Sequence, residues 1–236
     1  VYKRQALGPK ELGYGTGFYV NENTVVTNEH VTRQCAALRI TEPKHMRAKL
    51  TIVAQDANND LAILSSEQKP KNLAVFQNSY EASAGDEVHI IGYPAQRYRY
   101  IKANIVNNNF IMADEKTGFT QQKVLITDSV RKGNSGGPLL NAKGEVIGVI
   151  ESYIVTEKRK YRQDHQGAVE KVGTDVMVTG AAVHVDRLKA FLEKNRVTYY
   201  NQASISGKLS DQKIETYANE FIVKIRCVRR LSLIHI

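Results

Sequence analysis

A serine, a histidine and an aspartate stand in local sequences that suit nucleophilic catalysis. Ser135 lies in the glycine-rich segment 133–138, where backbone N–H groups stand beside it with few side chains in the way. Such N–H groups can converge on one point and stabilise an oxyanion there. A serine hydroxyl attacks well when a base takes its proton, and histidine titrates in the right range to be that base. His30 and Asp60 lie upstream and could serve as the base and as the carboxylate that orients it.

Each of these residues also has a plainer interpretation. Taken alone, His30 could be a structural histidine near a strand end, and Asp60 could be a turn or cap residue. Asp56 is a rival carboxylate four residues before Asp60, and Ser135 could be an ordinary turn serine. Their joint presence in one chain favours the catalytic interpretation.

The elements that must position these residues are predicted to be β-strands. Short segments rich in β-branched and aromatic residues dominate the first three quarters of the chain, and turn sequences separate them. Many short strands at this spacing predict a β-sandwich or β-barrels, so we expect an all-β fold. The clearest strand-like segments are 18–20, 24–27, 48–54, 88–91, 124–127 and 146–150.

The last quarter of the chain has a different pattern. Apolar residues at helical spacing predict a C-terminal helix at 185–196 that packs one face on the β body. Residues 197–210 are polar, and Asp211 could cap a second helix that precedes a strand-like segment at 221–225. We interpret 197–230 as a linker and the start of an incomplete C-terminal unit.

Composition and charge exclude some classes of protein. The 236 residues suffice for one large or two small β domains, and 42% hydrophobic residues indicate a globular chain. No apolar run approaches the length of a membrane span. A net charge of +9 could favour anionic partners but identifies none. Nothing in the sequence pairs Cys35 with Cys227, so we expect two free thiols and stability from packing.

The two ends of the chain could be encoded by complementary DNA. Residues 1–5 can be written as GTG TAT AAG AGA CAG, and the reverse complement, CTG TCT CTT ATA CAC, encodes residues 231–235. This DNA resembles a transposon end used to prepare sequencing libraries. Two unrelated peptides would not be expected to match over five codons. We therefore expect 1–5 and 231–236 to be translated adapter, outside the fold.

Four motifs resemble those of trypsin-like serine proteases of the chymotrypsin fold, and among them the bacterial HtrA/Deg branch. They are a glycine motif, a histidine motif, an aspartate motif and a serine motif, and the order His, Asp, Ser is that of the family. The segment 144–148 follows the serine as the next strand does in the family. The resemblance covers about residues 12–192, and its motifs are residues 15–18, 27–31, 60–64 and 133–139.

The resemblance implies a serine endopeptidase with two packed six-stranded β-barrels and a short α/β tail. The first barrel is expected at 6–84 and the second at 85–184, with the cleft between them. His30 would be the base, Asp60 would orient it, and Ser135 would attack. We prefer Asp60 to Asp56 because the family aspartate precedes a Leu-Ala-hydrophobic-Leu sequence. The N–H groups of Gly133 and Ser135 would form the oxyanion hole.

The resemblance also implies where a substrate side chain would bind. One wall of the pocket would precede the catalytic serine, and the other would be a strand that pairs with the substrate backbone. The aspartate that gives trypsin its basic preference is replaced by Ser129, so small or medium apolar side chains fit better. Arg131 and Lys132 could favour acidic groups near the cleavage site, or they could be solvated loop charges. The expected pocket residues are Ser129, Val130, Arg131, Ile150, Glu151, Ser152 and Tyr153.

A long charged segment at 156–174 is expected to be a loop that gates the site, because loops of this length are often functional. Apart from His30 and from His235 in the adapter-like end, the histidines show no metal-ligand spacing, so we expect no metal and no cofactor; they are His45, His89, His165 and His184. Residues 97–100 alternate arginine and tyrosine, which can suit nucleic acid. No nucleic-acid-binding module accompanies them, so we expect no nucleic acid partner.

The resemblance implies a protein or peptide substrate, an extracytoplasmic location (periplasmic, envelope or secreted) and room for a homo-oligomer. Two alternatives remain open at this point. The chain could be a regulatory or binding module built on a protease core, or a triad esterase or acyltransferase. A probe that labels the serine covalently, combined with a cleavage assay, separates these classes.

Overall fold

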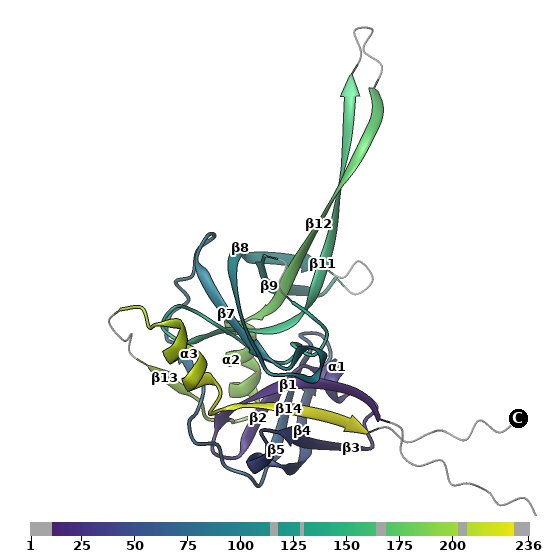
Figure 1. Cartoon of the computed structure of the whole chain (residues 1–236). Coiled ribbons are helices and arrows are strands. Elements are labelled where there is room, and N and C mark those ends of the chain that lie inside the picture. The colour runs from purple at the N-terminus through teal and green to yellow at the C-terminus, as the bar shows by residue number, and fades with distance from the viewer. Residues whose placement is uncertain (1–10, 114–117, 128–129, 164–168, 203–206, 229–236) are drawn as a thin grey trace, which may run out of the picture.

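Two β-rich halves make up the computed structural model, which describes residues 11–113, 118–127, 130–163, 169–202 and 207–228 (Figure 1). The first half is a closed antiparallel barrel with the strand order β1-β14-β3-β4-β5-β2. Its strand β5 is almost wholly buried, as the apolar sequence Leu-Ala-Ile-Leu predicts. The strands are β1 (Glu11–Asn21), β2 (Thr24–Thr27), β3 (Ala37–Glu42), β4 (Ala48–Asp56), β5 (Leu61–Ser66) and β14 (Ile222–Val228).

The second half is a sheet with the strand order β10-β7-β8-β9-β12-β11-β6-β13. An additional pairing of β10 with β11 joins six of these strands into a ring; β6 adds to β11 in parallel, and β13 adds to β6 in parallel. The all-β class with two packed barrels is thereby confirmed. The strands are β6 (Val75–Gln77), β7 (Glu87–Gly92), β8 (Arg99–Ala113), β9 (Thr120–Ile126), β10 (Pro138–Leu140), β11 (Val146–Gln163), β12 (Val169–His184) and β13 (Tyr200–Gln202).

Short helices connect and cover the two halves. The predicted C-terminal helix is α2 (Val185–Lys194), and its apolar residues Val185, Leu188, Phe191 and Leu192 are buried. These side chains belong to the same apolar cluster as the interior of the first barrel. The other helices are α1 (Glu29–Thr32), α3 (Asp211–Ala218) and the single turns η1 (Lys44–Met46) and η2 (Pro94–Gln96). No helix in the described part of the chain is long and apolar enough to cross a membrane.

The C-terminal segment differs from the prediction. We expected 197–230 to be a linker and the start of an incomplete unit, but β14 pairs with both β1 and β3 and closes the first barrel. Its apolar residues Ile222, Val223 and Ile225 are fully buried there. The N-cap of α3 is Ser210, whose hydroxyl accepts a hydrogen bond from the N–H of Lys213, and not Asp211. Strand β6 departs too, since it lies within 6–84 but pairs with β11 of the second sheet.

Residues 156–163 and 169–174, which were expected to belong to a loop, are strand. Strands β11 and β12 continue through them as an antiparallel pair, as far as Gln163 opposite Val169, and residues 164–168 lie outside the described residues. Figure 1 shows this pair of strands projecting away from the body of the molecule. Successive backbone hydrogen bonds between the two strands satisfy groups that a loop would leave to solvent. The gating role stays a prediction, now for a pair of strands rather than for a loop.

The two cysteines form a disulfide, so the expectation of free thiols is wrong. Cys35 and Cys227 are bonded, with their Cα atoms 5.4 Å apart. The register of β14 against β3 places Cys227 opposite Leu38, three residues after Cys35. The bridge thus links positions 192 residues apart in the sequence.

Replacing both cysteines by serine is expected to lower the free energy of unfolding by about 2–4 kcal/mol, since the crosslink restricts the unfolded chain. Urea denaturation in oxidising and in reducing buffer measures this effect. The reductant should destabilise the wild type and leave the Cys35→Ser/Cys227→Ser variant unchanged. Equal stability of the wild type in both buffers would mean that the bridge contributes nothing.

Candidate active site

His30 is the exposed residue of a short helix whose other side chains are buried. Helix α1 follows β2, and its residues Glu29, Val31 and Thr32 are buried. The side chain of His30 keeps 42% of its surface exposed. Because the buried side chains hold the helix against the barrel, the position of the His30 imidazole at the cleft is fixed.

Asp60 is the carboxylate that contacts His30. The Nδ1 of His30 lies 2.7 Å from Oδ2 of Asp60, and the backbone N–H of His30 donates to Oδ1 at 2.9 Å. An ionised carboxylate only accepts hydrogen bonds, so Nδ1 carries the proton of the neutral ring. The rival Asp56 instead accepts hydrogen bonds from the backbone N–H groups of Asn58 and Asn59 in its own turn.

The backbone around Asp60 is held in an uncommon conformation. Asp60 has a φ of 52°, in the left-handed region that non-glycine residues rarely adopt. The Nδ2 of Asn28 donates to the carbonyl of Asp60 at 2.8 Å, which fixes the peptide next to the N-cap of α1. Strained residues of this kind occur often at functional sites.

The surroundings of His30 favour the protonated form of its imidazole more than water does. Burial disfavours the charged form of the ring, but the hydrogen bond with Asp60 and the charges of Asp60 and Glu151 outweigh this effect. Together they raise the pKa of His30 above its ordinary value. The ring is thereby suited to take up a proton.

The turn that carries Ser135 requires glycine at two positions. Gly133 and Gly136 have φ values of 103° and 84°. A Cβ at Gly136 would lie 2.1 Å from Oγ1 of Thr27 and 2.3 Å from the carbonyl oxygen of Thr16. At Gly133 it would lie 2.4 Å from the carbonyl oxygen of Tyr93. The turn packs this closely because Thr16 donates its N–H to the Ser135 carbonyl and its hydroxyl to the Gly133 carbonyl.

Two N–H groups of this turn have no acceptor in the described part of the chain, those of Gly133 and Ser135. Their neighbours are engaged, since the N–H of Asn134 donates to Arg131 and that of Gly136 to Ile150. The Lys132 carbonyl accepts from the N–H of Ala95 at 3.2 Å. The C=O and N–H of a trans peptide point in opposite directions, so this bond turns the Gly133 N–H away from the η2 turn.

Ser135 shares a cavity with His30 and Asp60, but its hydroxyl points elsewhere. The cavity has a volume of about 620 Å³ and draws its walls from both halves of the molecule. The Oγ of Ser135 donates to the carbonyl of Glu151 on β11 at 2.9 Å. Within the described residues no hydrogen bond joins this hydroxyl to the ring of His30. The structure therefore brings the three predicted residues together and leaves the hydroxyl bonded to the neighbouring strand.

The predicted pocket walls are only partly reproduced. Val130, Arg131, Glu151, Ser152 and Tyr153 line the cavity. Ile150 does not, because its side chain is fully buried in the core of the second sheet. Ser129 lies outside the described residues. The cavity also includes residues that sequence reasoning did not single out, namely Arg33, Ala57 and Gln121.

A buried ion pair stands behind this cavity. The ammonium of Lys123 on β9 contacts the carboxylate of Glu151, and the Lys123 side chain is only 1% exposed. Burial raises the pKa of Glu151, although the charge and hydrogen bond of Lys123 counteract it. Strand alternation places Lys123 on the same face as Leu125, which is buried. This alternation was the one signal in the sequence for the burial of Lys123.

One cluster of potential metal ligands lies away from the cavity. Glu87, His89 and Asp211 have ligand atoms within 4.8 Å of one another. The ammonium of Lys102 already pairs with Glu87 at 2.8 Å and with Asp211 at 3.0 Å. The Nδ1 of His89 forms a hydrogen bond with the Tyr100 hydroxyl. All three side chains therefore have protein partners, and a lysine occupies the place where a cation would balance the charge.

Comparison with known proteins points to one family. A family model described as trypsin-like peptidase domain matches residues 15–149. The chain is 30% identical over 218 residues to the uncharacterized protein y4bJ of Sinorhizobium fredii, covering 90% of this chain and 32% of that protein. It is 31% identical over 153 residues to a probable periplasmic serine endoprotease DegP-like of Chlamydia pneumoniae, covering 62% of this chain and 30% of that protein. The chain thus spans about a third of the length of these relatives.

Solved structures support the fold. The active form of the Rv3671c protease from M. tuberculosis matches with a TM-score of 0.62 at 24% identity, covering 82% of this chain and 77% of that chain. The HtrA-type protease AlgW, crystallised with a decapeptide, matches with a TM-score of 0.60 at 19% identity, covering 77% of this chain and 51% of that chain. At these identities the likeness concerns the fold alone.

Proposed function

Because the chain belongs to the trypsin-like peptidase family, we propose that it is a serine endopeptidase that uses His30, Asp60 and Ser135. The observation that carries the proposal is the pair of hydrogen bonds from His30 to the Asp60 carboxylate, in the same cavity as Ser135. A ring held at Nδ1 leaves Nε2 to take a proton from the nucleophile. Protein or peptide substrates are the expected class.

The proposed reaction has two stages. Ser135 Oγ attacks the scissile carbonyl while His30 takes its proton, and the protonated ring then gives that proton to the leaving amine. Water hydrolyses the resulting acyl-enzyme with His30 again as the base. The N–H groups of Gly133 and Ser135, which have no acceptor among the described residues, would donate to the oxyanion of each tetrahedral intermediate. The loss of one such donor costs about a hundred- to a thousandfold in kcat in a comparable enzyme.

Substrate binding is proposed to release the serine hydroxyl from Glu151. In the structure the backbone carbonyl of Glu151 accepts a hydrogen bond from the Ser135 hydroxyl. Glu151 belongs to β11, the strand that is expected to pair with the substrate backbone. A substrate N–H that donates to this carbonyl would compete with the hydroxyl. Rotation about one side-chain bond would then turn Oγ toward His30. The same strand would thus bind the substrate and free the nucleophile.

The proposed specificity is not trypsin-like. The basic preference of trypsin comes from a pocket aspartate, and Ser129 stands at the matching position in this sequence. The carboxylate that does line the cavity, that of Glu151, is already paired with Lys123. We infer a preference for small or medium apolar side chains, with Val130 as an apolar wall. An extracytoplasmic location is proposed because the DegP-like relative is named periplasmic and disulfides persist in oxidising compartments.

A fluorophosphonate probe tests the proposal because it reacts with activated serines. The expected result is one adduct, located by mass spectrometry on the peptide that contains Ser135, together with cleavage of an unfolded protein substrate. The His30→Ala variant should form no adduct, because the base is missing. Labelling with ester hydrolysis but without peptide cleavage would favour an esterase or acyltransferase. The absence of both labelling and cleavage would favour a regulatory or binding module.

A further inference from the structure

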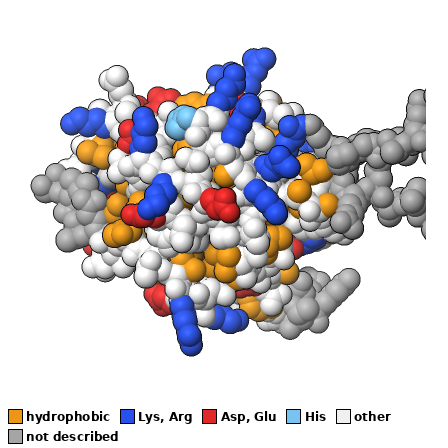
Figure 2. All heavy atoms as spheres, turned by 90° about the horizontal axis from the view of Figure 1, so that it is seen from below, with side chains coloured by type: hydrophobic (Ala, Val, Ile, Leu, Met, Phe, Trp, Pro, Cys, Tyr) orange, Lys and Arg blue, Asp and Glu red, His pale blue; other side chains and the backbone are white. Residues whose placement is uncertain are grey.

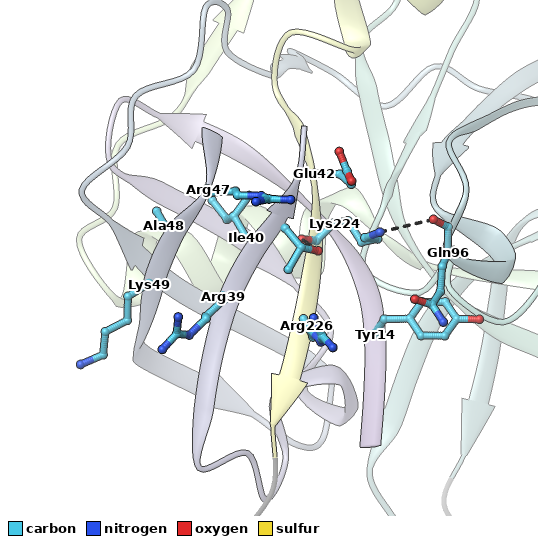
Figure 3. A pocket seen from close by; sticks show the side chains of 11 residues that line it. Tyr14, Arg39, Ile40, Glu42, Arg47, Ala48, Lys49, Gln96, Lys224 and Arg226 are labelled. Carbon is cyan, nitrogen blue, oxygen red and sulfur yellow. Dashed lines mark hydrogen bonds between the residues drawn. The ribbon is translucent and has the colours of Figure 1, made fainter. Parts of the chain in front are cut away.

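A second cavity, on the outer face of the first barrel, is lined mainly by basic side chains. It has a volume of about 620 Å³ and lies over strands β14, β3 and β4 (Figure 3). Five cationic side chains and one carboxylate, that of Glu42, line it. Figure 2, which views the molecule from below, shows Lys and Arg side chains spread over that face, with Asp and Glu side chains among them. The cations are Arg39, Arg47, Lys49, Lys224 and Arg226.

Three of these cations form one row across neighbouring strands. Arg226 lies directly opposite Arg39 in the β14–β3 register, and Arg39 lies directly opposite Lys49 in the β3–β4 register. Figure 3 shows the three side chains on successive strands. Directly opposite residues share a face of the sheet and lie about 5 Å apart, where like charges destabilise the pairing. The sequence therefore maintains two repulsive cross-strand pairs at one place.

Four of the five cations have no ion-pair partner among the described residues. They are Arg39, Arg47, Lys49 and Lys224. Lys224 instead donates to the backbone carbonyl of Gln96 at 3.4 Å and lies over the ring of Tyr93. Glu42 is opposite Lys224 in the register but is not within ion-pair distance of it. A bound anion would relieve the repulsion between Arg39 and Lys49, neither of which has an ion-pair partner among the described residues.

We propose that this basic cavity binds a compact ligand that carries two or more phosphate groups. The row from Arg226 to Lys49 spans two strand spacings, about 10 Å, so a single phosphate could not contact all its cations. Arginine binds phosphate through two parallel hydrogen bonds, and three of the five cations are arginines. Each phosphate group brings more negative charge and more acceptor oxygens than a carboxylate, which suits so dense a cluster better than an acidic peptide.

A nucleic acid strand fits the cavity less well. Single-stranded nucleic acid is bound along a basic track with aromatic side chains on which successive bases stack. Tyr14 is the one aromatic residue that lines this cavity, and it is half-buried. The cations are confined to a patch three strands wide. The ligand chemistry that remains is an oligophosphate, either free or presented by lipid headgroups.

Isothermal titration calorimetry with tripolyphosphate tests the site. The wild type should bind at one site, and Arg39→Gln/Lys49→Gln should weaken binding by about tenfold or more, because two cations of the row are removed. The matched control is Lys194→Gln/Arg196→Gln, which removes one lysine and one arginine from exposed positions outside the cavity. The control should bind within about twofold of the wild type. No binding by the wild type, or equal weakening in both double variants, would overturn the proposal.

Two further measurements guard against a folding artefact. Without ligand, Arg39→Gln/Lys49→Gln should unfold at the same or a higher temperature than the control, because it removes like-charge repulsion. Glu42→Gln should tighten the binding of tripolyphosphate, since it removes the one carboxylate from the lining. Unchanged or weaker binding by Glu42→Gln would contradict an anion site even if the double variant failed to fold.

Sedimentation with lipid vesicles distinguishes the two sources of phosphate. Vesicles of phosphatidylcholine with cardiolipin, whose headgroup carries two phosphates, assign the cavity to lipid headgroups if they bind the protein and are displaced by tripolyphosphate. Tripolyphosphate binding without vesicle binding assigns it to a free oligophosphate. Tighter binding of a single-stranded oligonucleotide than of tripolyphosphate would replace the proposed ligand by nucleic acid.

Discussion

Replacement of Ser135 by alanine is expected to lower kcat for peptide hydrolysis by about a millionfold, as removal of the nucleophile does in a comparable protease. The substitution removes one oxygen atom, whose one hydrogen bond among the described residues is to the Glu151 carbonyl, so the fold should be unaffected. Initial rates on a fluorogenic peptide, measured beside the thermal unfolding temperature, separate lost chemistry from lost structure. Ser83→Ala, at an exposed serine outside the cavity, should keep wild-type kinetics.

The loss from Ser135→Ala should not add to the loss from His30→Ala. Residues that act as one unit each remove most of the rate when replaced, so the double variant should be about as slow as either single variant. Strictly additive losses would show that the two residues act independently, and a residual rate within about a hundredfold of the wild type would point to another nucleophile.

The second large effect concerns stability. Replacement of Lys123 by methionine is expected to lower the free energy of unfolding by about 3–5 kcal/mol, because it leaves the Glu151 carboxylate buried without its partner. Urea denaturation at about pH 8 measures this loss, since the carboxyl group is then ionised in the unfolded chain. Lys123→Met/Glu151→Leu should recover most of the stability, because an apolar pair of similar size avoids the buried charge.

The same variant should show a characteristic pH dependence. Burial already raises the pKa of Glu151, and the loss of Lys123 removes the charge that opposes this shift. The folded variant would then hold a proton that the unfolded chain releases, so its stability should fall as the pH rises from the ordinary glutamate range through the raised pKa. At pH values below that range the deficit relative to wild type should shrink. A deficit that is constant with pH would assign the loss to packing alone.

Local features of the candidate active site could be predicted from the sequence. Ser135 sits between Gly133 and Gly136, and glycine is required at both because their φ angles are positive and a Cβ would lie about 2 Å from neighbouring atoms. His30 and Asp60 lie in motifs only 30 residues apart, and their hydrogen bonds join adjacent parts of one barrel. These predictions depended on short segments, where residue type and backbone conformation are tightly linked.

Features that depend on distant pairing could not be predicted. The sequence around Cys227 does not show that β14 lies beside β3, because that register is set by a closed barrel built from both ends of the described chain. The pairing of β11 with β12 through 156–163 was missed because charged residues there resemble a solvated loop. Lys123 would ordinarily be placed on the surface, and only the fold reveals Glu151 next to it. The row of Arg226, Arg39 and Lys49 likewise exists only in the folded sheet.

The position of β14 also bears on the order in which the molecule is made. Synthesis proceeds from the N-terminus, so residues 222–228 leave the ribosome after the other described strands have emerged. Until they arrive, β1 and β3 have open edges, and the barrel that holds His30 against Asp60 is incomplete. On the proposed mechanism, Ser135 would therefore lack its base until β14 has closed the first barrel.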